Sequence, residues 1–244
     1  MCRRWCRGDW GGGVDLDRIR AVAFDAVGTL IHPEPSAAEV YARIGRRFGS
    51  RLEIGEIRNR FRAAFAEQEA IDRANGWVTS EERERRRWQE IVAAVLDDVH
   101  DRAGCFGKLY AHFGKPGAWR CEPASECFEQ LRQARISIAL ASNYDHRLHA
   151  VLDAFSVFEY VTHRVISSEV GWRKPAPQFF ARLAETFRLP AEAVLYVGDD
   201  WDNDYEGARR AGMPVLLFDP WAKRLDLGGH RIGNLRNLPL TSGR

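Results

Sequence analysis

Lysine is scarce in this 244-residue chain: its 36 lysines and arginines include only four lysines, Lys108, Lys115, Lys174 and Lys223. A lysine that falls within a motif is therefore informative. The formal net charge is only +2, so the chain lacks the basic excess of a nucleic-acid-binding protein. We expect a small-molecule ligand and no nucleic-acid partner.

Cysteine is also too sparse to form a scaffold, because the five cysteines are an odd number without the spacing of a disulfide or zinc framework. We expect free thiols. No apolar run approaches the roughly 18 residues of a membrane-spanning helix. Residues 1–13 lack the apolar centre of a secretory leader. The sequence thus predicts a cytoplasmic protein without membrane contact and with a flexible tail at residues 1–15, while its oligomeric state stays open.

The hydrophobic pattern changes along the chain from strand-like to helical. Residues 21–26 form a short apolar run, whereas residues 36–100 are highly charged and carry apolar side chains at helical spacing. Ser80 precedes the acidic start of one such helix, where serine is a favoured N-cap. The arginines of this helix are expected on its solvated face: Arg83, Arg85, Arg86 and Arg87.

Beyond residue 117, short apolar strands alternate with helical segments and no hairpin turn intervenes. Strands are predicted at 136–141, 160–166, 193–197 and 214–218. Strands joined through helices run parallel. We therefore predict an α/β fold, a doubly wound Rossmann-like parallel sheet with an inserted α-helical cap. The predicted core comprises residues 1–32 and 116–244, and the predicted cap comprises residues 33–115.

Chemically reactive side chains follow four of the predicted strands. Ligands of open parallel sheets bind beyond the carboxyl ends of the strands, so these side chains should converge on one site. They are, in chain order, Asp25, the pair Ser142 and Asn143, Lys174, and the acidic run from Asp199 to Asp204.

In this order, the four segments resemble the four motifs of the haloacid dehalogenase-like hydrolases. The run at residues 197–212 is especially similar to the fourth motif. The resemblance extends over residues 20–220, although the cap matches only in its position and helical character. It implies a hydrolase whose nucleophilic aspartate stands at the tip of the first strand.

The resemblance also implies a metal site. Asp25 would be the nucleophile, and one Mg²⁺ would bind Asp25, Asp199 and the backbone carbonyl of Val27. Lys174 would balance the negative charge and hold Asp25 ionised.

The remaining motif residues are implied to bind the phosphate or to support the metal site. Thr29, the Ser142 hydroxyl and the Asn143 region, through a backbone N–H, would contact the phosphate or the substrate. Asp204 would orient metal-bound waters or Lys174.

Val27 departs from the phosphatases of this family, in which a second aspartate at this position is the general acid. Valine can neither protonate a leaving group nor activate water, and a general acid is typically worth ~10²–10⁴-fold. Hydrolysis of ordinary phosphomonoesters should therefore be slow, whereas an acyl phosphate needs the acid less. His32 is the nearest titratable side chain, but we interpret it as a partly exposed loop histidine.

Three functions remain open. The favoured one is a Mg²⁺-dependent phosphatase that acts on a small phosphorylated metabolite. The second is a metal-independent 2-haloacid dehalogenase, a class that also lacks the second aspartate but replaces the carboxylate retained here as Asp199. The third is a catalytically impaired binding protein. Trp77, in a turn between two cap helices, is a candidate for substrate contact.

Overall fold

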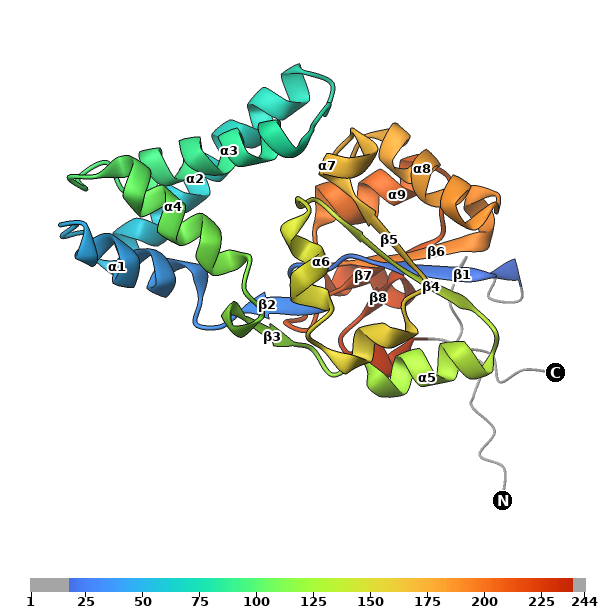
Figure 1. Cartoon of the computed structure of the whole chain (residues 1–244). Helices are drawn as coiled ribbons and strands as arrows, with labels where there is room; N and C mark the ends of the chain where they lie inside the picture. Colours follow the sequence, from blue (N-terminus) through green and yellow to red (C-terminus); the bar gives the residue numbers. More distant parts are fainter. Residues whose placement is uncertain (1–17, 239–244) are drawn as a thin grey trace.

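The computed structural model describes residues 18–238 and consists of an α/β core joined to a helical cap (Figure 1). Six strands form one parallel sheet in the order β5-β4-β1-β6-β7-β8. The predicted doubly wound α/β fold is therefore confirmed. The tail predicted at residues 1–15 lies outside the described residues.

The order of the strands reverses on the two sides of β1. The six strands are β1 (Ala21–Phe24), β4 (Ser137–Ser142), β5 (His163–Ile166), β6 (Val194–Gly198), β7 (Val215–Phe218) and β8 (Arg231–Ile232). From β1 the sheet extends through β4 to β5 on one side, and through β6 and β7 to β8 on the other. The gap between the carboxyl ends of β1 and β6 is thus the topological switch point, where ligands of such sheets bind.

Two layers of helices bury the sheet on both faces. They include α5 (Ser125–Gln133), α6 (Arg147–Leu152), α7 (Ser167–Val170), α8 (Pro177–Phe187) and α9 (Gly207–Arg210). Phe24 of β1 packs against Phe128 of α5, whereas Ala23, on the opposite face, belongs to the same cluster as Phe179 of α8. Burial on both faces explains why the strands are continuously apolar in sequence.

The cap is inserted between two short strands, β2 (Ile31–Pro33) and β3 (Trp119–Cys121), which pair antiparallel. It contains α1 (Ala37–Arg47), α2 (Ile54–Ala74), α3 (Glu81–Val95) and α4 (Arg102–Phe113), which share an apolar core of their own. In Figure 1 the cap projects from the core beyond this strand pair. Ser80 is the N-cap of α3 as predicted, since its side chain accepts a hydrogen bond from the Arg83 N–H. The sequence pattern did not predict α4 or the pairing of β2 with β3.

A largely buried group of charges, here called the cap–core ion cluster, joins the two parts. It consists of Glu69, Asp72, Arg83, Glu84 and Arg87 of the cap and Arg173 of the core. Arg87 is 1% exposed and pairs with Asp72. The prediction of a solvated face is therefore wrong for Arg87 and for Arg83, which is 19% exposed and contacts Asp72. The α3 sequence does not reveal the carboxylates that α2 places opposite these arginines. Arg86 remains exposed and pairs only with Glu82.

The described part of the chain also bears on two compositional expectations. Cys105, Cys121 and Cys127 are free thiols, and the other two cysteines lie outside the described residues. Among residues 18–238, no helix combines the length and the apolar character needed to cross a bilayer.

Candidate active site

The switch point brings together carboxylates from β1 and from the segment after β6. Ligand oxygens of Asp25, Asp199 and Asp204 all lie within 4.8 Å of one another. Asp25 is only 5% exposed, whereas Asp199 is exposed to solvent. One ammonium group, that of Lys174, contacts this group of acids. Three carboxylates and one ammonium leave an excess of negative charge.

The pKa values of these acids reflect that excess. Burial raises the pKa of the Asp25 carboxyl well above its ordinary value; Asp204 and Asp199 add to this effect, and Lys174 opposes it. Desolvation within the site, followed by the charge of Asp204, raises the pKa of Asp199 to about 7. A cation favours the ionised form of a nearby carboxyl and reverses both shifts. The oxygen-only donor set and its charge therefore fit Mg²⁺.

The ammonium group of Lys174 lies at the centre of this site, with four oxygen atoms around its three N–H bonds. Its Nζ donates to Oδ1 of Asp25 and Oδ1 of Asp204, each at 2.6 Å, and lies 3.1 Å from the Ala141 carbonyl oxygen. Burial alone lowers the pKa of Lys174, but Asp204 and Asp25 raise it above its usual value. Lys174 therefore remains a cation that orients Asp25 and leaves the second oxygen of that carboxylate for other chemistry.

Tyr196 is a residue of the candidate site that the sequence interpretation missed. Its hydroxyl accepts from Lys174 Nζ at 2.8 Å and lies 3.0 Å from Oδ1 of Asp204. Burial and the charge of Asp204 raise the pKa of Tyr196 well above its ordinary value, so it stays protonated. The only signal was a phenol within an otherwise aliphatic strand.

Of the three residues predicted to contact the phosphate or the substrate, two line the cavity and one is buried beneath it: Ser142, Asn143 and Thr29. Ser142 lines the cavity above Asp25. The Asn143 side chain binds the backbone of Lys174 on both sides. Its Oδ1 accepts from the backbone N–H of Lys174 at 2.7 Å, and its Nδ2 donates to the backbone carbonyl of Lys174 at 3.0 Å. Thr29 is completely buried and its hydroxyl donates to Oδ1 of Asp199 at 3.0 Å. Thr29 thus orients the Asp199 carboxylate, while its contact with the phosphate or the substrate stays a prediction.

Two glycines permit this close packing. Gly28 has a φ of +103°, and a Cβ built on it would lie 2.5 Å from both carboxylate oxygens of Asp199. A Cβ on Gly198 would lie 2.4 Å from Cγ of Asp204. Both motif glycines are therefore needed for steric reasons.

A cavity of about 320 Å³ lies above these residues, between the core and the cap. Asp25, Ser142, Lys174 and Asp199 belong to its polar floor. Its cap walls are aromatic and aliphatic, and include Tyr41, Phe61, Phe65, Trp88, Val92 and Phe113. Trp77 is not among the lining residues; its carbonyl instead accepts a hydrogen bond from the Arg173 N–H at 2.9 Å.

The family assignment follows from comparison with known proteins. The family model described as haloacid dehalogenase-like hydrolase matches residues 19–212. The chain belongs to this hydrolase family. A human relative, haloacid dehalogenase-like hydrolase domain-containing protein 3, is 26% identical over 206 residues, which cover 82% of each chain. A ribulose-1,5-bisphosphate 5-phosphatase of Halopiger xanaduensis is 35% identical over 99 residues, which cover 40% of this chain and 41% of the relative.

Solved structures share the fold of this hydrolase. The magnesium-bound HAD-hydrolase YfnB of Bacillus subtilis superposes with a TM-score of 0.69 at 19% identity, covering 91% of this chain and 97% of the other. The L-2-haloacid dehalogenase of Xanthobacter autotrophicus gives a TM-score of 0.68 at 19% identity, with the same coverage. These likenesses show the shared fold, which by itself does not identify the reaction that this hydrolase catalyses.

Val27 stands where a phosphatase of this family has its general acid, and His32 is the nearest titratable side chain that could replace it. Val27 lines the cavity beside Asp25. His32 lies on β2 outside the cavity lining, with its Nε2 3.4 Å from Glu122, and burial lowers its pKa. His32 is therefore not positioned to replace the missing acid.

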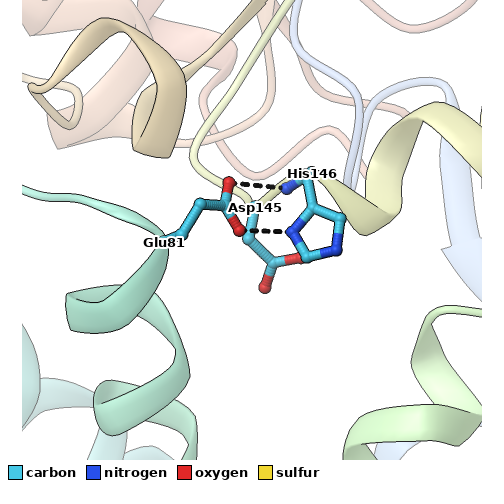
Figure 2. Close-up of side chains that lie close together, drawn as sticks. All are labelled: Glu81, Asp145 and His146. Atoms are coloured by element: carbon cyan, nitrogen blue, oxygen red, sulfur yellow. Dashed lines mark hydrogen bonds and ion pairs between the residues drawn. The ribbon is translucent and has the colours of Figure 1, made fainter.

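Glu81, Asp145 and His146 form a second polar cluster, where α3 of the cap meets the core (Figure 2). The Glu81 carboxylate accepts from both the backbone N–H of His146, at 2.9 Å, and its ring Nδ1. Asp145 is paired with Arg147 and accepts from the Tyr110 hydroxyl. Because these carboxylates already have donors, the cluster acts as a contact between cap and core.

Proposed function

We propose that this hydrolase is a Mg²⁺-dependent phosphatase whose nucleophile is Asp25 and whose intermediate is an aspartyl phosphate. The observation that carries the proposal is the convergence of Asp25, Asp199 and Lys174 at the switch point. Asp25 and Asp199, with the Val27 carbonyl, would hold the ion. When bound, Mg²⁺ would neutralise charge on the phosphoryl oxygens.

The chain's own residues supply the remaining chemistry. Lys174 keeps one oxygen of Asp25 in place, and the other oxygen attacks phosphorus while the bond to the leaving oxygen breaks. Asp204 and Tyr196 hold Lys174, and Asn143 fixes its backbone. Water then attacks the phosphorus of the aspartyl phosphate and restores the carboxylate as inorganic phosphate leaves.

Val27 makes the first step dependent on the leaving group of the substrate and slows the second step for every substrate. No carboxylate at this position protonates the leaving oxygen or activates the water. The substrate should therefore be a phosphorylated metabolite whose leaving group departs without a proton, such as an acyl phosphate. The same valine also favours a second candidate function, a phosphate-binding protein with little turnover.

Asp199 distinguishes the proposal from a 2-haloacid dehalogenase. Carboxylates at both Asp25 and Asp199 suit a cation, which halide displacement by an aspartate does not require. The cavity also offers poor charge complementarity to a haloacid carboxylate, because Arg147 pairs with Asp145 and Arg173 with Glu84.

Acetyl phosphate hydrolysis with and without Mg²⁺ tests this proposal. Wild-type activity should require Mg²⁺ and vanish in Asp25→Asn. Equal rates in excess EDTA would overturn the metal assignment. Metal-independent chloride release from 2-chloropropionate would establish the dehalogenase instead.

Val27→Asp separates a slow enzyme from a binding protein. The new carboxylate adds the missing acid and base, so turnover of an alkyl phosphate should rise by up to ~10²–10⁴-fold. Val27→Asn, of similar size but without a titratable group, is the control and should give no such rise. An unchanged rate in Val27→Asp would favour the binding protein.

A further inference from the structure

The cavity above Asp25 has two chemically distinct halves. Its floor carries the carboxylates and Lys174, while no charged residue of the cap helices contributes to its lining. Phe61 lies at the centre of the cap wall, with its ring centroid 5.5 Å from that of Tyr41, 6.1 Å from that of Phe65 and 6.5 Å from that of Trp88. A group bound against this wall is thus surrounded by aromatic faces and edges.

Several polar groups of the wall are engaged within the protein. The Tyr110 hydroxyl donates to Asp145 at 3.2 Å, and the Trp119 and Tyr144 side chains both donate to the Phe113 carbonyl, at 2.9 and 3.1 Å. The two guanidinium groups that reach the cavity are also paired. Arg147 contacts Asp145 and lies 3.3 Å from the centroid of the Tyr110 ring.

Arg173, the other guanidinium, is part of the cap–core ion cluster and contacts Glu84. Since these cations are neutralised by protein carboxylates, the upper cavity has no free charge for a second phosphate. Hydroxyl-rich sugars would lose hydration against the aromatic wall without adequate replacement. An aromatic ring, in contrast, gains both apolar burial and ring–ring contacts there.

Val27 imposes a second, independent requirement on the same group. Without a general acid, the leaving oxygen must depart as an anion. A phenol has a pKa of ~10, whereas that of water is ~15.7, and aliphatic alcohols resemble water in this respect. A phenolate is therefore far better suited than an alkoxide to leave this site unprotonated.

We propose that the substrate is an aryl phosphate monoester, with the phosphoryl group at Asp25 and the aromatic ring against the wall around Phe61. This rests on the proposed phosphatase function and specifies its substrate class. The Asp25 oxygen forms a bond to phosphorus, and the P–O(aryl) bond breaks with its electron pair going to the aryl oxygen. The phenolate takes a proton from water after leaving. Hydrolysis of the aspartyl phosphate then releases inorganic phosphate.

Phosphonates test the ring preference without any difference in chemical reactivity. We would measure binding of 1-naphthylmethylphosphonate and of methylphosphonate to the wild-type protein in Mg²⁺ by calorimetry. Burial of the naphthyl ring should give at least ~30-fold tighter binding than methylphosphonate. Equal affinities would overturn the proposal.

Two matched cap variants locate the ring. Phe61 and Phe48 are both half-buried phenylalanines packed on the cap core, but only Phe61 lines the cavity. Phe61→Leu should weaken naphthylmethylphosphonate binding about fivefold or more and leave methylphosphonate unchanged, whereas Phe48→Leu should alter neither. Equal effects of the two variants on naphthylmethylphosphonate would place the ring elsewhere.

The two proposals fail in different experiments. Absence of Asp25-dependent acetyl phosphate hydrolysis, with the naphthyl preference intact, would overturn the phosphatase function and retain the aromatic specificity. Acetyl phosphate hydrolysis without a naphthyl preference would retain the phosphatase and overturn the aryl substrate. In the successful case, 1-naphthyl phosphate should have a KM well below that of glycerol phosphate.

Discussion

At the scale of single residues, the active site depends on glycines that leave room for carboxylates. Gly28→Ala introduces a methyl group 2.5 Å from the Asp199 oxygens at a φ of +103°. Asp199 must move, so we expect Mg²⁺ affinity to fall at least tenfold and the strained backbone to cost about 1–3 kcal/mol of stability. Calorimetric Mg²⁺ titration and urea unfolding measure the two effects.

Gly55→Ala is the control for that substitution. Gly55 lies in α2, and a Cβ there meets nothing within 4 Å. Alanine favours helix, so this variant should be as stable as the wild type or slightly more so, with unchanged Mg²⁺ binding. Unchanged Mg²⁺ affinity in Gly28→Ala would contradict the role assigned to Asp199.

The residue scale also shows the limits of the sequence. Asp25 and Lys174 stand in recognisable segments, and the resemblance of the Asp25 segment to the first family motif made the missing acid at Val27 visible. Tyr196 carries no such signal, because its role arises from contacts with Lys174 and Asp204 that depend on the folded sheet. The orientation of Thr29 toward Asp199 could not be inferred for the same reason.

At the scale of elements, Arg173 connects α2 and α3 of the cap to the loop that carries Lys174. Arg173→Met removes a cation that is 3% exposed and leaves Glu84 buried without its partner. Breaking a buried ion pair typically costs about 3–5 kcal/mol, so we expect a loss of that order in the free energy of unfolding. Urea denaturation followed by fluorescence measures it.

Arg86→Met provides the comparison within α3. Arg86 is 63% exposed and pairs with Glu82, so its loss should cost at most about 1 kcal/mol. Similar losses in the two variants would show that the cap–core ion cluster adds no stability.

The contact between Glu81 and His146 makes docking of α3 sensitive to pH. The hydrogen bond to Glu81 raises the pKa of His146 above 6.5, although partial burial opposes it. Because the folded-state pKa is raised, the stabilising effect is complete below pH 6.5 and is lost as the pH rises through the raised value. NMR titration should therefore give a higher His146 pKa in the wild type than in Glu81→Gln. Identical values would exclude the contact in solution.

At the scale of the whole molecule, alternation of strands and helices sufficed to predict the parallel sheet and the convergence of Asp25, Lys174 and Asp199 at its carboxyl edge. The cap was recognised as helical, but its docking could not be derived. The buried pairing of Arg87 with Asp72 depends on how α2 and α3 face each other, which helical periodicity leaves undetermined. The lining of the candidate substrate cavity could not be predicted from the sequence either, because residues of both cap and core form it once the cap has docked.

The most direct test of the account is whether Asp25 becomes phosphorylated. Since Val27 cannot activate water, the aspartyl phosphate formed from acetyl phosphate in Mg²⁺ should persist long enough for intact-protein mass spectrometry. We predict an adduct of one phosphoryl group, mapped to Asp25 by peptide analysis and absent from Asp25→Asn. No adduct in the wild type during acetyl phosphate turnover, or an equal adduct in Asp25→Asn, would contradict the account.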